Sequence, residues 1–211
     1  MTKNRTIRLS LQQYVEQEIL PRYDLFDAAH QREHVDAVIE QSMEMADYYE
    51  VDCNMVYAIA AYHDTGIAVD RETHHLHSGR IVRCDNCLRQ WFSEEQIEVM
   101  AQAVEDHRAS NSDEPRSIYG KIVADADRQI DGYTIVCRTV QYAMQHHPEA
   151  DKLRIQELAL RHLDEKYAEG GYLRFWLPQS ANAERLRQFQ QLIKDRDAIR
   201  RYIGQVYDAL Q

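Results

Sequence analysis

Glycine and proline are scarce in this sequence, with 7 and 4 residues among 211. A fold built on many tight turns needs more of both, so the scarcity favours long helices with short connections. The 4 cysteines are too few for a disulfide scaffold, and no apolar run is long enough to cross a bilayer. Charges throughout residues 1–20 argue against a signal peptide. These absences predict a cytoplasmic protein with no membrane partner.

Basic residues are also fewer than acidic ones. The chain has 25 Lys and Arg against 35 Asp and Glu, which gives a net charge of −10. A nucleic-acid surface needs clustered cations, so the sequence predicts no nucleic-acid partner. A small anionic substrate remains compatible with this charge, because bound metal ions supply local positive charge.

Hydrophobic residues recur at helical spacing along most of the chain, and strand-like alternation is nearly absent. The composition and length fit one domain with a sizeable core. We therefore predict an all-α protein with a single helical domain over residues 1–211. Asn54 is the expected N-cap of the central helix, and Ser93 to Gln96 form an expected capping box. The expected helices cover 8–20, 30–49, 55–64, 76–91, 94–107, 118–130, 133–146, 150–167 and 181–210.

The central helix runs into an unusual pair of ionisable residues, His63 and Asp64, followed by Thr65 and Gly66. Two neighbouring ionisable groups at a buried helix end are costly to desolvate unless something compensates them. A divalent cation does so, because it takes imidazole nitrogen and carboxylate oxygen together. The pair therefore indicates a candidate metal site.

Further His and Asp residues lie at or near the ends of other predicted helices, where facing helices of a bundle build metal sites. They are His34, His107, Asp127 and the cluster His74, His75 and His77. Spacing alone does not select ligands among 10 histidines, because some will lie near each other by composition. The order in which these residues occur along the chain is more specific than their spacing.

Three segments resemble the motifs of the HD superfamily of metal-dependent phosphohydrolases. They are Arg32 to Val38 around His34, Ala61 to Gly66 around the His63-Asp64 pair, and Val123 to Arg128 around Asp127. The resemblance covers roughly residues 25–140 and implies an HD-type helical bundle there, with 141–211 as a helical C-terminal extension. It also implies one metal held by His34, His63, Asp64 and Asp127. Asp125 competes for the last place, although the residue directly before the Arg is favoured.

Some members of the superfamily hold a second metal with two additional histidines. His74 precedes the small pair Ser78-Gly79 by four residues and fits better than His77, and His107 closes a helix as the second histidine does. Asp64 would then bridge two ions. This pattern is similar to dinuclear cyclic-dinucleotide phosphodiesterases, dinucleoside-tetraphosphate hydrolases and diiron oxygenases of the superfamily. The implied cofactor is one or two divalent ions of Mn, Fe, Mg, Zn or Ni.

The resemblance implies hydrolysis of a phosphoester or phosphoanhydride in a small, nucleotide-like substrate, with Asp64 and His107 as catalytic residues. Many relatives place Glu or Lys shortly after the doublet, and this chain has neither there. Phosphate contacts are therefore expected from Arg80, Arg108, Lys121 and Arg128, although Arg128 is equally well explained as an ion-pair partner. A diiron oxygenase and a nucleotide sensor without turnover are the alternative functions.

Two other features stay outside the predicted site. The lone Cys84-x-x-Cys87 pair lies in a predicted helix and is best explained by packing. The aromatic residues Tyr172, Phe175 and Trp176 either cover the site or form a homodimer interface, and the sequence leaves both open.

Overall fold

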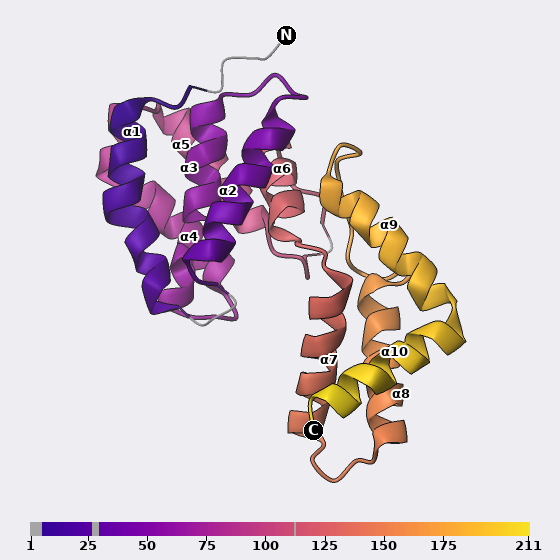
Figure 1. Ribbon diagram of the computed structural model, residues 1–211. Helices are drawn as coiled ribbons and strands as arrows, with labels where there is room; N and C mark the ends of the chain where they lie inside the picture. Colours follow the sequence, from indigo (N-terminus) through magenta and orange to yellow (C-terminus); the bar gives the residue numbers. More distant parts are fainter. Residues whose placement is uncertain (1–5, 27–29, 112) are drawn as a thin grey trace. The chain divides into compact units, whose positions relative to one another are not determined.

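The computed structural model describes residues 6–26, 30–111 and 113–211. Within these residues the chain forms helices α1 to α10 and no strand, which confirms the all-α prediction (Figure 1). The chain divides into two compact units. Unit 1 is Met1–Arg128 with Phe175–Ser180, and unit 2 is Gln129–Arg174 with Ala181–Gln211. The predicted division into 25–140 and 141–211 stays a prediction.

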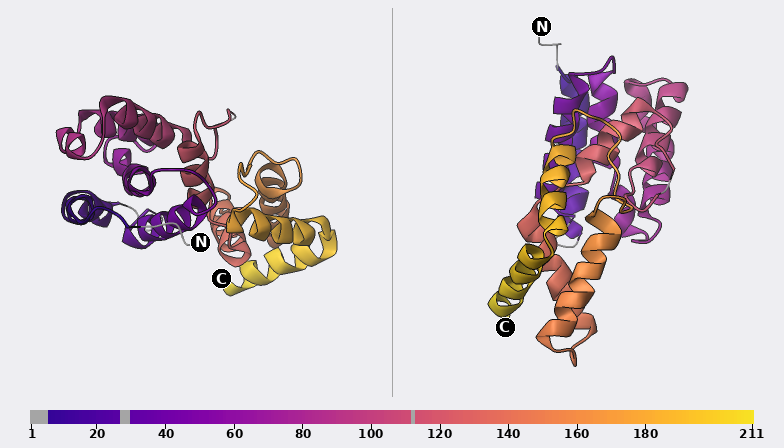
Figure 2. Two further views of the ribbon diagram at one scale, coloured as in Figure 1. Left: turned by 90° about the horizontal axis from the view of Figure 1, so that it is seen from above. Right: turned by 90° about the vertical axis from the view of Figure 1, so that its right-hand side faces the viewer.

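Unit 1 contains six α-helices and the short helical turns between them. The α-helices are α1 (Leu9–Tyr14), α2 (Arg32–Ala46), α3 (Cys53–Tyr62), α4 (His74–Cys84), α5 (Glu94–Asp106) and α6 (Ile118–Asp127). A π-helix (Val15–Ile19) and 3-10 helices at Leu20–Leu25, Thr65–Ala68 and Asn86–Gln90 connect them. Helix α3 is apolar nearly all round and lies at the centre, with α2, α5 and α6 packed against it (Figure 2).

Unit 2 contains α7 (Gly132–His146), α8 (Lys152–Tyr167), α9 (Ala181–Lys194) and α10 (Arg196–Ala209). Apolar residues at helical spacing bury one face of each helix, among them Val140, Leu163, Ile193 and Ile203. No helix in the described residues is long and apolar enough to cross a membrane.

Three predicted helix boundaries are wrong. The predicted helix 8–20 is wrong at its end, since the helical conformation continues through Pro21, which is tolerated in the first turn of the 3-10 helix Leu20–Leu25. The predicted helix 76–91 ends at Cys84, where Asp85 caps the following 3-10 helix with its side chain. The predicted helix 181–210 breaks at Asp195, whose carboxylate accepts the Ala198 N–H and starts α10.

The N-cap of α3 also differs from the prediction. Asp52, and not Asn54, caps this helix, since its Oδ1 accepts the Asn54 N–H at 2.8 Å. The capping box at Ser93 and Gln96 is confirmed by both of its hydrogen bonds. Both residue types favour caps for the same reason, and only the local backbone decides which of two neighbouring candidates is used.

Candidate metal centre

The His63-Asp64 pair lies where α3 ends, inside unit 1. His63 is fully buried and Asp64 is 2% exposed. The buried Tyr23 side chain holds this helix end, because its hydroxyl donates to the Ala61 carbonyl at 2.9 Å and accepts the Asp64 N–H at 3.2 Å. The backbone of the pair is therefore fixed from the side of the 3-10 helix Leu20–Leu25.

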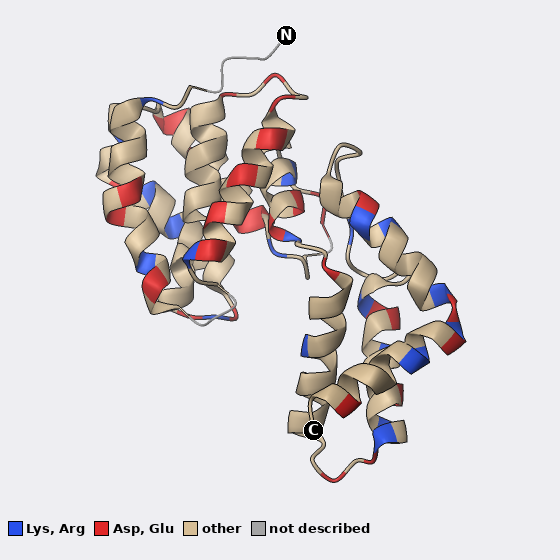
Figure 3. Ribbon diagram, viewed as in Figure 1, with Lys and Arg blue, Asp and Glu red and all other residues tan. Residues whose placement is uncertain are grey.

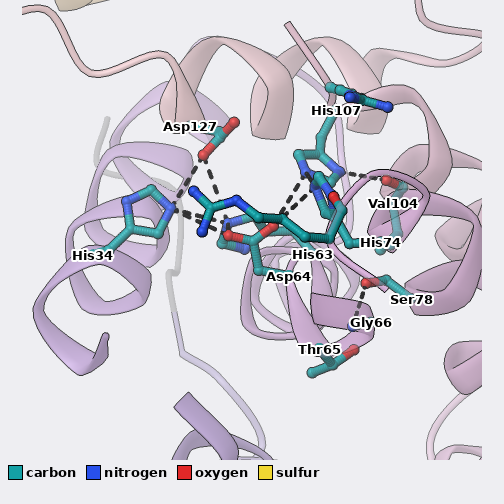
Figure 4. Close-up of polar contacts among 12 residues, drawn as sticks. His34, His63, Asp64, Thr65, Gly66, His74, Ser78, Val104, His107 and Asp127 are labelled. Carbon is teal, nitrogen blue, oxygen red and sulfur yellow. Dashed lines mark hydrogen bonds and ion pairs between the residues drawn. The ribbon is translucent and has the colours of Figure 1, made fainter. Parts of the chain in front are cut away.

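One group of side chains gathers around His63 (Figure 4). His34 comes from the first turn of α2, and Asp127 is the last residue of α6. The His34 Nε2 lies 3.2 Å from the His63 Nε2 and 3.2 Å from the Asp127 Oδ1. The Asp64 Oδ2 lies 3.3 Å from the His63 Nε2 and 3.6 Å from the His34 Nε2.

A second group gathers on the other oxygen of Asp64. His74 is the first residue of α4, and His107 follows the last residue of α5. Their Nε2 atoms lie 3.2 Å apart, and the Asp64 Oδ1 is 3.3 Å from His74 and 3.4 Å from His107. Asp64 thus directs one oxygen to each group of histidines, as the close-up shows (Figure 4).

These separations fit a shared cation better than direct hydrogen bonds. Ligand atoms about 2.1 Å from one ion lie roughly 3.0 to 3.4 Å apart in octahedral or tetrahedral arrangements. Most contacts within each group fall in this range, from 3.2 to 3.4 Å. Imidazole and carboxylate together suit Zn, Mn, Fe or Ni ions. The donor set and its spacing therefore fit the predicted metal.

Three of the imidazole rings have their other nitrogen facing a carbonyl. The Nδ1 atoms lie 2.7 Å from the Ala60 oxygen for His63, 2.6 Å from the Val104 oxygen for His107, and 2.8 Å from the Arg71 oxygen for His74. A carbonyl only accepts, so Nδ1 carries the proton and Nε2 presents a lone pair in the neutral ring. This is the usual orientation of a metal-binding histidine.

The charges of the site reinforce one another. Burial opposes ionisation of Asp64, but the rings of His63, His107 and His34 outweigh it and hold the pKa of this carboxyl well below its ordinary value. Burial also opposes charge on His34, yet Asp127 and Asp64 raise the pKa of its ring to about 10. Two buried carboxylates among histidines favour bound positive charge, either protons on the rings or a cation. This site in unit 1 is therefore suited to bind a cation.

Helix α4 reaches the site through a close backbone approach that the sequence analysis missed. The Ser78 hydroxyl accepts the Gly66 N–H at 2.7 Å, and a Cβ on Gly66 would lie 2.2 Å from the His74 carbonyl oxygen. A larger residue at position 66 would therefore push α4 away and His74 with it. Gly66, two residues after Asp64, was the available signal.

The alternatives left open by the sequence now have distinct places. His74, and not His77, contacts Asp64 among the described residues. Asp127 lies beside His34, whereas Asp125 is fully buried and accepts the backbone N–H groups of Trp176 and Leu177. The Cys84-x-x-Cys87 pair spans the end of α4 and the next 3-10 helix, so the predicted placement within one helix is wrong.

The four predicted phosphate-binding cations occupy different surroundings. Arg80 is exposed on α4. Burial lowers the pKa of the His74 ring, and His107 and Arg108 add to this shift. Lys121 pairs with Glu114 at the start of α6. The Arg128 side chain is only 2% exposed and its Nη1 lies 3.4 Å from the Asp125 Oδ1, which fits the alternative of an ion-pair partner.

Comparison with known proteins gives a match over the part of the chain that carries the site. Neither curated proteins nor solved structures give a match. A family model described as the HD domain matches residues 32–129, a range that includes His34, His63, Asp64, His74, His107 and Asp127. Residues 32–129 are therefore similar to the HD domain, whose superfamily is one of metal-dependent phosphohydrolases.

Proposed function

We propose that this protein is a metal-dependent phosphohydrolase that acts on a phosphoester or phosphoanhydride of a small, nucleotide-like substrate. The observation that carries the proposal is the position of Asp64 between two histidine groups, with Oδ2 toward His34 and His63 and Oδ1 toward His74 and His107. A carboxylate with one oxygen at each of two donor groups suits a pair of ions, as in other two-metal hydrolases.

The residues of the site would divide the work as follows. His34, His63 and Asp127 would hold one cation, His74 and His107 a second, and Asp64 would contact both. Divalent cations bound there would neutralise phosphoryl oxygens and lower the pKa of water. Both ring nitrogens of His107 face partners, since Nδ1 meets the Val104 carbonyl and Nε2 meets Asp64. We therefore assign His107 the role of a ligand, and its predicted direct catalytic role stays a prediction.

The substrate is expected to be small and anionic. Arg108 lies beside the second histidine group and is the favoured phosphate contact, although one of its N–H groups donates to the Glu72 carbonyl. Exposed Arg80 on α4 is the next candidate. Acidic side chains line the exposed face of α2, namely Glu33, Asp36, Glu40 and Glu44 (Figure 3). Such a surface disfavours a long polyanion, which would meet repulsion outside the site.

Metal content and turnover test the proposal together. Protein purified without added metal would be assayed for bound metals, and then for release of phosphate or nucleoside monophosphate from a nucleotide panel with Mn²⁺. We expect Asp64→Asn to abolish turnover and to weaken metal binding. His146→Gln, at an exposed histidine in unit 2, is the matched control and should behave as wild type. Full metal loading without turnover on any phosphorylated compound would refute hydrolysis.

A diiron oxygenase remains the second candidate, because the same six side chains in two groups around one carboxylate also suit a pair of iron ions. This function predicts iron in the purified protein and oxygen consumption that depends on it. Finding manganese or magnesium alone, with one site filled, would remove it. Metal and nucleotide binding without any reaction would favour the third alternative, a sensor.

A further inference from the structure

Asp125 is a buried carboxylate that the proposed chemistry does not use. It lies in α6, two residues before Asp127, and is fully buried. Its oxygens accept the Trp176 N–H at 3.0 and 3.1 Å and the Leu177 N–H at 2.8 Å. A buried carboxylate is costly unless such donors satisfy it. Asp125 and these two amides therefore depend on each other.

The amides belong to a short segment that we call the strap, residues Phe175–Ser180. The strap packs with unit 1, although the chain before and after it belongs to unit 2. Leu177 is 6% exposed and lies in the apolar core of unit 1, where Trp176 also packs. The Tyr49 hydroxyl donates to Gln179. Leu177 and Trp176 thus anchor the strap in the apolar core, its amides donate to Asp125 of α6, and Tyr49 of the segment after α2 donates to it.

Arg128, the residue directly after Asp127, also contacts Asp125 and the strap. Its guanidinium lies 6.0 Å from the centre of the Trp176 ring, and its Nη1 is 3.4 Å from the Asp125 Oδ1. Burial lowers the pKa of this arginine, and the charges of Asp125 and Asp127 oppose that shift. A buried guanidinium needs a carboxylate partner. If Asp125 lost its charge, Asp127 would be the remaining carboxylate that acts on Arg128.

We infer that Asp125 is a positioning residue of the candidate metal centre, which anchors the strap to α6 and occupies Arg128 so that Asp127 stays available to a cation. The inference rests on the proposed function, because it assumes that Asp127 binds metal. Asp125, which competed with Asp127 as a candidate ligand in the sequence, thereby has a role without binding the metal. It also gives the strap a role in the site although no strap residue belongs to either metal-binding group.

The test measures Mn²⁺ affinity by calorimetric titration of the full chain, together with the melting temperature. Asp125→Asn should weaken Mn²⁺ binding about tenfold, as removal of a residue behind a ligand commonly does. Arg128→Met should bind Mn²⁺ as well as wild type or better, because a positive charge near Asp127 is gone. The double variant should bind nearly as well as Arg128→Met, and it keeps the comparison possible if Asp125→Asn alone fails to fold.

Two controls separate positioning from general instability and from failure of the proposed site. Val15→Ala removes two buried methyl groups at a position distant in sequence from Asp125 and Arg128. This variant should lower the melting temperature without changing the Mn²⁺ affinity. Equal loss of affinity in Val15→Ala and Asp125→Asn would overturn the inference, as would wild-type affinity in Asp125→Asn. Asp127→Asn tests the site itself. If wild type and Asp127→Asn both fail to bind Mn²⁺, the proposed function fails instead.

Discussion

Gly66 shows how a single residue without a side chain decides the geometry of the candidate site. Its backbone touches α4 closely enough for its N–H to donate to Ser78, and no Cβ fits between it and the His74 carbonyl. His74 starts α4 at this contact. The distance between the two histidine groups therefore depends on the size of residue 66.

Gly66→Ala should destabilise the protein by about 2 to 3 kcal/mol, because the added methyl group meets backbone atoms that cannot move aside cheaply. Urea unfolding measures the change. Gly170→Ala is the control, since a Cβ there meets no atom within 4 Å and only the positive φ of 87° opposes it. That control should lose only about 1 kcal/mol. Equal losses in the two variants would contradict the close approach.

Tyr23 is a second residue whose effect is local. Tyr23→Phe keeps the buried ring but leaves the Ala61 carbonyl and the Asp64 N–H without the hydroxyl, so we expect a loss of about 1 to 2 kcal/mol in urea unfolding. Tyr48→Phe, at a side chain that is 65% exposed, should be neutral. A neutral Tyr23→Phe would show that the hydroxyl does not hold the end of α3.

At the scale of elements, helices α4 and α5 are joined by charge as well as by packing. Arg83 of α4 binds both carboxylate oxygens of Glu98, at 2.8 and 2.9 Å, and contacts Glu105 at 2.5 Å. Bidentate pairs of this kind are stronger than single contacts. Because His74 and His107 come from these two helices, their pairing also sets the second histidine group.

Arg83→Met should cost about 1 kcal/mol at pH 7, and the cost should shrink in acid. Arg83 lowers the pKa of Glu98 to about 2, below its ordinary value of 4.5. The contribution is therefore present above about pH 4.5 and is lost as the pH falls toward 2. Urea unfolding of both proteins from pH 7 to pH 3 measures it. Arg154→Met, in an exposed pair with Glu157, should change little at any pH.

Buried tyrosines influence the stability of the whole molecule. Burial raises the pKa of Tyr57 and Tyr167 to about 12 and raises the pKa of Tyr62 further, with help from Asp85. A raised pKa in the folded state means that the unfolded state releases protons first. The stability that these groups confer is complete below about pH 10 and is lost as the pH rises above it.

The free energy of unfolding should therefore fall steeply between pH 10 and pH 12. Tyr62→Phe should start lower at pH 8, because Asp85 loses a donor, but should decline less steeply in alkali. Tyr48→Phe serves as the exposed control with an unchanged slope. Parallel declines for wild type and Tyr62→Phe would contradict the contribution of Tyr62.

Much of this protein could be predicted from the sequence because the relevant signals are local. Helical periodicity gave the all-α class, and the Ser93 box gave the start of α5. The predicted boundaries at Cys84 and Asp195 were wrong because the Asp85 and Asp195 side chains cap new helical segments there. The predicted boundary at Pro21 was wrong because proline is tolerated in the first turn of a helix. The candidate site could be predicted because the residues that flank His34, the His63-Asp64 pair and Asp127 match the family's motifs.

The sequence by itself determined the class of the fold and indicated the order of the candidate ligands, since both depend on residue type and order. Only the tertiary structure decided that His74 rather than His77 reaches Asp64, and that Asp125 faces the strap while Asp127 faces His34. These choices depend on which of several similar side chains a packed neighbour brings within about 3 Å. Contacts between residues far apart in the chain fix that distance, and spacing along the chain does not.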